Sequence, residues 1–399
     1  MHIKVVLALL LCLLALPSKA QTSTDLQLAQ YYYNNAELDK ALGYFEKVYA
    51  QDQSKAIFLQ YYECLVAQND FKTAEKVWRK QTTINKQDFQ IRLLGATLYE
   101  DQNEPNKAQK IYQELFDELQ PNNPGQAIGL YQAFVAKAMF DQAKKALEMG
   151  QKLSPNYPFN FQMADYYSLV GNKKAMLMAY MDYLGQQPGT LDPIAQAIGS
   201  RLDLSASNGQ DFNLCREVLL ERIQQAGAPM VFNQLLIWLF VQVRDFSGGV
   251  TQAIALNKRM RGDGREVLEL GHICVENAVF DQANRCFQYV IELGQDRPHF
   301  YDAQRALLNA RFIQVTQYRS FNDTEIAQCI ADFESALNRL GRNRVTFQLI
   351  LQLAEIRAFY AKQSAMALDE LQALMRTSGL TDLQIAQVKM LVADIEVLE

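Results

Sequence analysis

The sequence FDQAKKAL at residues 140–147 contains a phrase that recurs along this chain of 399 residues. It consists of a large apolar residue, two polar residues, a small residue and, four positions after the small one, another large apolar residue. Similar copies stand at residues 38–45, 71–78, 105–112, 246–253 and 280–287, with looser first or last residues at 105–112 and 246–253. The small residues are Ala41, Ala74, Ala108, Ala143, Gly249 and Ala283, and a weaker copy has Met176 in that position. A period of about 34 residues predicts a stack of structural repeats, which favours a binding function over catalysis.

Within each unit, apolar residues at helical spacing predict two antiparallel helices joined by a polar turn. Leu93, Ala96 and Tyr99 show the spacing of a first helix, and Ala41 and Phe45 show that of a second. Proline and glycine between the units end one helix and let the chain enter the next at a new angle. The predicted units are residues 22–55, 56–88, 89–123, 124–157, 158–190, 229–262 and 264–297.

The small and aromatic residues of these units resemble those of the tetratricopeptide repeat family. The resemblance is best in three units, through Gly95-Ala96, Tyr99, Ala108 and Tyr112, through Tyr131, Phe134, Ala143, Leu147 and Pro155, and through Gly271, Ala283 and Phe287. Small side chains let paired helices approach closely where they cross, and aromatic residues fill the space toward the next unit. The resemblance implies an all-α fold, a right-handed α-solenoid of antiparallel helix pairs. Tyr62, Met176 and Cys274 depart from the family pattern, which indicates irregular stacking rather than a different fold.

The repeat pattern predicts five segments. Residues 1–20 are a signal peptide, 21–190 an N-terminal repeat array, 191–228 a degenerate repeat that forms a joint, 229–297 further repeats, and 298–399 atypical helical repeats ending in a half repeat. In the last segment we expect helices at residues 301–317, 323–340, 345–362, 364–377 and 381–398. We expect either that the natural chain is longer or that the final helix caps the stack, because it would expose one apolar face: Ile385, Val388, Leu391, Val392, Ile395 and Leu398.

The first residues have the pattern of a secretory signal peptide. Lys4 precedes an unbroken apolar run at residues 5–16. The small residues Ser18 and Ala20 stand three and one positions before a predicted cleavage site in front of Gln21. The run is too short to span a bilayer. Lipid attachment at Cys12 and a buried first helix over residues 1–20 are less favoured alternatives. We therefore expect an exported bacterial protein, periplasmic or associated with the outer membrane, without a transmembrane segment in the mature chain.

Charge and cysteine content limit the partners and the covalent chemistry. Residues 1–20 hold two of the 39 basic residues and none of the 44 acidic ones, so the mature chain carries a net charge of about −7, which disfavours nucleic acid as a partner. A disulfide between Cys274 and Cys286 remains an alternative, because both residues stand in one predicted hairpin. Packed free thiols are the favoured interpretation. The five cysteines of the mature chain form no CxxC pair: Cys64, Cys215, Cys274, Cys286 and Cys329.

No pattern for catalysis, metal binding or cofactor binding stands out. His272 and His299 lack Cys or carboxylate partners at metal-ligand spacing. The sequence contains no GxGxxG, GxxxxGK[ST] or GxSxG string. The adjacent Glu100 and Asp101 are typical of a solvated helix end rather than of a general acid and base. We therefore expect no enzyme activity, no metal and no cofactor.

Basic residues gather near residue 260. Arg261-Gly262-Asp263 spells a cell-adhesion tripeptide, but it stands where a turn between units belongs. Lys258, Arg259 and Arg265 flank this turn and could receive an acidic partner or a membrane surface. Cations at the end of a helix are the favoured interpretation, because they complement the helix dipole.

In a stack that resembles tetratricopeptide repeats, the first helices line a concave groove, and the helical register gives the side chains that face it. These side chains are rich in amides and carboxylates, with a few aromatic residues: Gln30, Tyr33, Asn34, Leu59, Glu63, Thr97, Glu100, Asp101, Gln132, Asp165, Gln234, Trp238, Gln242, His272 and Glu276. Family members that bind C-terminal carboxylates do so with Lys, Arg and Asn side chains in the groove. At the positions where the first Lys of that set would stand in successive units, this chain has Leu26, Leu59, Leu93, Ile128 and Phe161. The carboxylate clamp is therefore not expected, and the groove should prefer an extended peptide or a partner surface that is apolar and basic.

The sequence therefore predicts a non-enzymatic protein–protein interaction scaffold that binds a partner protein or an extended peptide in its groove. The alternative is a repeat-built carbohydrate or small-ligand binding protein for nutrient uptake, in which exposed aromatic residues stack on the ligand. An enzyme would require a further catalytic domain beyond Glu399. The identity of the partner and the oligomeric state do not follow from the sequence.

Overall fold

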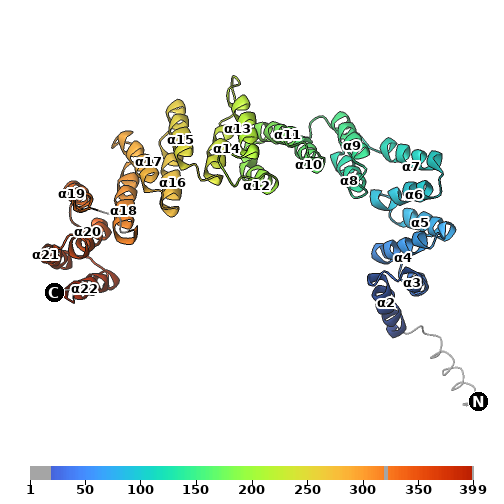
Figure 1. Ribbon diagram of the computed structural model, residues 1–399, viewed down its shortest axis with the longest axis horizontal. Helices are drawn as coiled ribbons and strands as arrows, with labels where there is room; N and C mark the ends of the chain where they lie inside the picture. The colour runs from blue at the N-terminus through green and yellow to red at the C-terminus, as the bar shows by residue number, and fades with distance from the viewer. Residues whose placement is uncertain (1–18, 319–321, 398–399) are drawn as a thin grey trace, which may run out of the picture. The chain divides into compact units, whose positions relative to one another are not determined.

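The structure of the protein is a computed structural model that describes residues 19–318 and 322–397, with side chains from residue 24 onward. The described residues form 21 α-helices and two short 3-10 helices, without a strand (Figure 1). The predicted fold class, an all-α solenoid of antiparallel helix pairs, is confirmed. The predicted signal peptide lies almost entirely outside the described residues and stays a prediction. The chain divides into two compact units, Met1–Ala179 and Tyr180–Glu399.

The first unit is a row of helices in which most pack against their neighbours along the chain, and α8 packs against α6 and α9 (Figure 1). The pairs follow the predicted repeats, with α2 and α3 as the first pair and α8 and α9 as the fourth. The helices are α2 (Lys19–Asn34), α3 (Leu38–Gln51), α4 (Lys55–Ala67), α5 (Phe71–Ile84), α6 (Phe89–Asp101), α7 (Pro105–Asp117), α8 (Pro124–Val135), α9 (Phe140–Leu153) and α10 (Asn160–Leu169). The boundary between the two units falls inside the next helix, α11 (Lys173–Gln186).

The second unit continues with the same kind of packing. Its helices are η1 (Pro188–Thr190), α12 (Leu191–Arg201), α13 (Gln210–Ile223), α14 (Val231–Gln242), α15 (Phe246–Met260), α16 (Arg265–Glu276), α17 (Phe280–Glu292), α18 (Phe300–Tyr318), α19 (Asp323–Leu340), η2 (Arg344–Thr346), α20 (Phe347–Phe359), α21 (Ser364–Met375) and α22 (Asp382–Glu396). The predicted joint at residues 191–228 and the other segment limits stay predictions. No helix among the described residues is long and apolar enough to cross a membrane.

Most of the described turns inside helix pairs have one residue in the left-handed conformation. At the end of α4, the N–H of Asn69 donates to the carbonyl of Val66 and that of Asp70 donates to Leu65, each at 2.9 Å. This is a Schellman motif, which satisfies carbonyls that the end of a helix leaves unpaired. The corresponding left-handed residue at the end of α8 is Ala138, with φ 55°. Asp70 then accepts from the N–H of Thr73 at 3.1 Å and caps α5, so a single short segment ends one helix and starts the next.

The recurring phrase forms the core of each pair. Its small residues Ala41, Ala74 and Ala143 are fully buried, as is the aromatic Phe45. The first helices carry their own small residues at the crossing points. A Cβ added to Gly95 would stand only 2.0 Å from the Trp78 ring, so α6 and α5 approach each other too closely for any side chain there.

The last helix differs from its sequence prediction. The expected apolar face of α22 is largely covered, because Val388 and Ile395 are fully buried against the cluster that includes α20 and α21. Ile385, Leu391 and Val392 are half-buried. The apolar residues that the helix exposes are instead Leu383, Met390 and Val397. Leu398 lies outside the described residues. The predicted helix at residues 345–362 begins with the separate turn η2, so α20 itself starts at Phe347.

Candidate functional site

Three first helices of the second unit, α16, α18 and α20, enclose a groove of about 890 Å³. These helices stand next to one another because α18 contacts both α16 and α20. The floor of the groove is apolar and includes Leu308 and Leu349, which are almost fully buried. The groove is lined by Arg265, Leu268, Glu269, His272, His299, Tyr301, Asp302, Gln304, Arg305, Ala306, Leu308, Asn309, Ala336, Leu340, Asn343, Val345, Thr346, Gln348, Leu349 and Gln352.

Amide side chains supply most of the polar groups near the groove floor. The Nε2 of Gln352 on α20 donates to the Oδ1 of Asn309 on α18 at 3.0 Å, which ties the two first helices together. Gln304 is only 8% exposed, and its Oε1 is buried without a hydrogen-bond partner among the described residues. A buried acceptor left unpaired costs about 1–3 kcal/mol. Because this oxygen is shielded from solvent even though the groove is empty, a group bound in the groove could reach it only if the Gln304 side chain turned.

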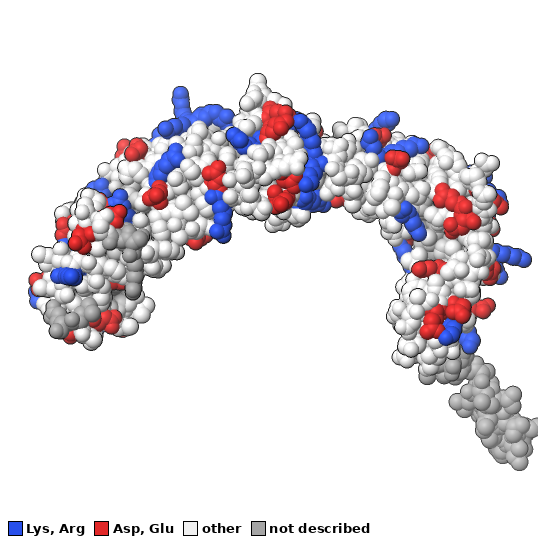
Figure 2. Space-filling model, viewed as in Figure 1, with Lys and Arg blue, Asp and Glu red and all other residues white. Residues whose placement is uncertain are grey.

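The charged side chains that line the groove occur in pairs of opposite sign. The Nε of Arg265 donates to Oε1 of Glu269 at 2.9 Å, one helical turn further along α16. On α18 the Nη2 of Arg305 donates to Oδ1 of Asp302 at 2.6 Å. In the view of Figure 2, basic and acidic residues are likewise interspersed within each unit, with uncharged surface between them. The groove is therefore close to neutral.

The Arg261-Gly262-Asp263 tripeptide lies in the turn between α15 and α16, as the sequence predicted. Arg261 ends α15 in the left-handed conformation, with φ 51°. The buried Asn257 fixes this turn, because its Oδ1 accepts from the N–H of Gly264 at 3.1 Å and its Nδ2 donates to the Tyr289 hydroxyl at 2.9 Å. The tripeptide is thus part of a hydrogen-bonded turn rather than of a free loop.

The charges around this turn also have local partners. Lys258 and Arg259 occupy the last turn of α15, where cations complement the helix dipole. The backbone N–H of Arg265 donates to Oδ1 of Asp263 at 3.1 Å, and this bond lowers the pKa of the Asp263 carboxyl. His299 Nε2 stands 3.5 Å from the same carboxyl and adds to that effect when it is protonated.

In the first unit, tyrosines of neighbouring helices bind three of the carboxylates predicted to face a groove. The donors and acceptors are Tyr33 to Glu63, Tyr131 to Asp165 at 2.9 Å, and Tyr112 to Glu100 at 2.8 Å. Burial raises the pKa of Tyr33 to about 12, and the hydrogen bond to Glu63 acts in the same direction. These carboxylates therefore hold adjacent helices together, which the sequence pattern did not reveal.

The other predicted residues of the first unit are exposed or half-buried. Thr97 is half-buried and its hydroxyl donates to the carbonyl of Leu94 within α6 at 3.0 Å. Leu59 is also half-buried. Exposed side chains on the first helices are those of Gln30, Asn34, Asp101 and Gln132.

In the second unit, His272 is the only predicted groove residue that lines the groove of about 890 Å³. Trp238 on α14 is half-buried, and its ring lies over Gly199 of α12. Gln234 is half-buried, whereas Gln242 and Glu276 are exposed outside the lining.

Sequence reasoning missed the five amide residues of the groove, Gln304, Asn309, Asn343, Gln348 and Gln352. They belong to residues 298–380, where the repeat lengths become irregular and no register was assigned. A usable signal is present in the spacing of Gln348 and Gln352, which puts two amides on the same face of a predicted helix.

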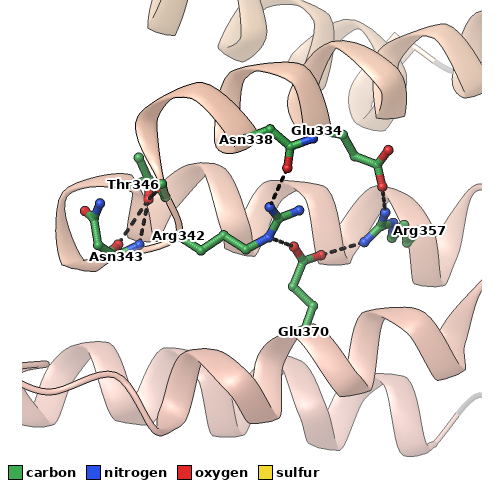
Figure 3. A network of polar contacts seen from close by, with 8 residues as sticks. Glu334, Asn338, Arg342, Asn343, Thr346, Arg357 and Glu370 are labelled. Atoms are coloured by element: carbon green, nitrogen blue, oxygen red, sulfur yellow. Dashed lines mark hydrogen bonds and ion pairs between the residues drawn. The ribbon is translucent and has the colours of Figure 1, made fainter.

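A polar network lies on a different face of α20, where the helix meets α19 and α21 (Figure 3). Arg357 is almost buried, with Nη1 2.8 Å from Oε2 of Glu370, and its Nη2 pairs with Glu334. Arg342 Nε stands 3.0 Å from Oε1 of the same Glu370, and its Nη1 donates to Asn338 at 3.1 Å. Figure 3 shows both guanidinium groups turned toward Glu370. Because every charge has an opposite partner, the network is best explained as a link between three helices.

The cysteines and histidines do not assemble a metal site within the described residues. The five cysteines of the described chain are buried free thiols. Cys274 and Cys286 are hydrogen-bonded neighbours between α16 and α17, and that bond together with burial raises the pKa of Cys286 far above its usual value.

Comparisons with known proteins give structural likeness only. No family model matches the chain, and no curated protein matches it either. Among solved structures, the TPR domain of P58(IPK) is similar with a TM-score of 0.26 and 10% identity, over 95% of this chain and 98% of that one. The APC/C hetero-tetramer Cut9-Hcn1 gives a TM-score of 0.25 and 12% identity, over 97% and 92% of the two chains. Naa15/Naa10 bound to HypK gives 0.26 and 11%, over 93% and 66%. These scores are low and identify neither a function nor a partner.

Proposed function

We propose that this protein is a non-enzymatic scaffold that binds another protein through the groove between α16, α18 and α20. The observation that carries the proposal is the groove itself, which combines an apolar floor with exposed amide side chains such as Asn309 and Gln348. Ligand sites combine apolar surface with a few placed polar groups in this way. An extended segment of a partner supplies both apolar side chains and backbone donors.

The location of the protein is a separate proposal. The positive start, apolar run and small residues of positions 1–20 support export to the periplasm or to the outer membrane of a bacterium, with cleavage after Ala20. Sequencing the N-terminus of the protein from cell fractions tests this proposal. A chain that begins at Gln21 in the envelope fraction is the expected result, and an intact Met1 in the cytoplasm would contradict it.

Site-specific photo-crosslinking tests the binding face. A crosslinking residue at Gln348, which is exposed in the groove, should capture a partner from an envelope extract, whereas the same residue at exposed Gln372 on α21 should not. Val345→Asp should abolish that capture without unfolding the protein, because Val345 is 93% exposed at the groove edge.

The captured protein must then bind the purified chain in a titration that Val345→Asp weakens at least about tenfold. Equal capture at both positions, or capture that Val345→Asp leaves unchanged, would refute the assignment of the groove. A panel of sugars in thermal-shift measurements completes the test, since stabilisation by a sugar favours the carbohydrate-binding alternative.

A further inference from the structure

We infer that the outward face of α22 pairs with the same face of a second copy of this chain, as a short parallel coiled coil. The inference concerns the oligomeric state and is independent of the proposed function, because α22 does not line the groove. Two observations carry it: the spacing of the apolar residues that α22 exposes, and the charges that flank them.

The first observation is the spacing of the exposed apolar residues on α22. Leu383, Met390 and Val397 follow one another at intervals of seven residues, and their exposed fractions are 72%, 68% and 87%. Ala386 and Ala393 are also exposed and stand three residues after Leu383 and Met390. This alternation of three and four residues is the heptad pattern of a coiled-coil seam, with the larger residues at position a and the alanines at position d. Small residues at position d let two helices approach closely.

This seam lies on the side of α22 that faces away from the rest of the second unit. Val388 and Ile395, on the other side of the helix, are fully buried against the cluster that includes α20 and α21. Cap residues included, no other helix among the described residues exposes three large apolar side chains. A continuous apolar stripe of this kind is typical of an interaction surface.

The second observation is that the charges beside the seam complement themselves in a parallel pair. In the same heptad register, Lys389 stands at position g and Asp394 at position e, and both are exposed. Position g of one helix faces position e in the next heptad of a parallel partner, so Lys389 of each copy would face Asp394 of the second copy. The two-fold symmetry of a dimer forms this ion pair twice. Neither residue has an ion-pair partner among the described residues of its own chain.

An antiparallel pair would place like charges together. Position g then faces position g of the other helix, so Lys389 would meet Lys389 of the second copy, and Asp382 would meet Glu396 of the second copy. Like charges that face each other weaken a helix pair. The charges therefore select the parallel arrangement, in which one face of α22 carries both members of the ion pair.

The length of the seam sets the expected affinity. The 15 residues of α22 form a helix that is about 22 Å long. The seam therefore has far fewer residues than the about 20–30 on each side of a stable interface. We expect a reversible dimer with a dissociation constant of about 10–100 µM.

Sedimentation equilibrium of the purified chain between about 5 and 500 µM tests the association, and the natural protein should change from monomer to dimer over this range. Met390→Glu puts a charge at the centre of the seam and should raise the dissociation constant at least about tenfold. Its Tm should equal that of the natural protein, because Met390 is exposed. Met366→Glu is the matched control: Met366 on α21 is 60% exposed and lies outside the seam, so this variant should associate like the natural protein.

Two charge variants test the parallel arrangement. Lys389→Glu and Asp394→Lys each turn both ion pairs of the dimer into like-charge pairs, so either variant alone should associate about tenfold more weakly than the natural protein. In an equimolar mixture of the two variants, each introduced charge faces an opposite charge. The mixture should therefore form a heterodimer about as stable as the natural dimer. In an antiparallel pair, Lys389→Glu would instead associate most tightly with the natural protein.

Three results would each overturn the inference. The chain could remain monomeric at about 500 µM, well above the expected dissociation constant. Met390→Glu could associate as tightly as the natural protein, which would place the interface elsewhere. The mixture of the two charge variants could associate no more tightly than either variant alone, which would exclude the parallel pairing of Lys389 with Asp394. The proposed function would remain intact in each case, because partner capture at the groove is a separate measurement.

Discussion

Replacing Gly95 by Ala tests whether helices in this stack cross as closely as the structure shows. In the middle of a helix, Ala is more favourable than Gly by about 1 kcal/mol. At Gly95, however, the new Cβ would stand 2.0 Å from Cζ2 and 2.4 Å from Cε2 of Trp78. Carbon atoms in contact prefer a separation of about 3.5–4.0 Å, so the indole would have to move by more than about 1 Å.

The indole cannot move freely. Trp78 is 8% exposed, and its Nε1 donates to the carbonyl of Ile91 at 2.9 Å. Overpacking a core costs about 1–3 kcal/mol, and a buried donor that loses its partner costs a similar amount. After subtracting the gain in helix propensity of about 1 kcal/mol, we expect Gly95→Ala to destabilise the first unit by about 1–5 kcal/mol.

Gly43→Ala is the matched control. Gly43 lies in the middle of α3, and no heavy atom stands within 4 Å of the added Cβ. This variant should be more stable than the natural protein by up to about 1 kcal/mol. Urea unfolding followed by Trp78 fluorescence measures both, in a Trp238→Phe background that leaves Trp78 as the single tryptophan. If Gly95→Ala is as stable as Gly43→Ala and the fluorescence of Trp78 is unchanged, the close crossing of α5 and α6 is wrong.

Three further substitutions have expected outcomes. Arg357→Met should destabilise the second unit by about 3 kcal/mol in urea unfolding, because it breaks the buried pair with Glu370, which then keeps only Arg342 as an ion-pair partner. A loss below about 1 kcal/mol, the value of an exposed ion pair, would contradict the network as drawn. Ala138→Gly should stabilise the first unit by about 0.5–1 kcal/mol, since Ala138 has a φ of 55° that Gly adopts without strain, and a loss of stability would contradict this turn. Tyr33 should ionise near pH 12 in an ultraviolet titration, so stability should fall as pH rises from 10 to 12, and Tyr33→Phe should reduce that fall. The sign follows because a raised pKa stabilises the folded state only while the hydroxyl keeps its proton.

The helix pairs could be predicted from the sequence because the pattern of small and apolar residues is local and recurs in each unit. Small residues such as Ala74 and Ala143 must be small wherever two helices cross, and the structure buries both completely. Helix limits in the irregular region were also predictable, and α19 begins and ends at the predicted residues. The turns were predictable from polar residues, but the left-handed Ala138 was not, because alanine is rare in that conformation.

The groove could not be predicted in the same way because a register argument treats polar residues as exposed. Glu63 and Asp165 were expected to face a ligand, whereas tyrosines of neighbouring helices bind them. Such partners come from a different helix and lie about 30 residues away in the sequence. The helical period places each side chain on a face of its own helix, but it does not give the side chain that the next helix brings to that face.

Helix α20, one of the helices that line the groove, shows most clearly what a sequence pattern cannot reveal. Ten of the 13 residues of α20 are buried, including Gln352 and Arg357, so the helix has no apolar stripe that would reveal a core face. Its two sides carry polar groups with different partners. Arg357 finds carboxylates from α19 and α21, which makes that side structural. On the other side, Gln352 meets Asn309 in the groove through which we propose that the protein binds a partner.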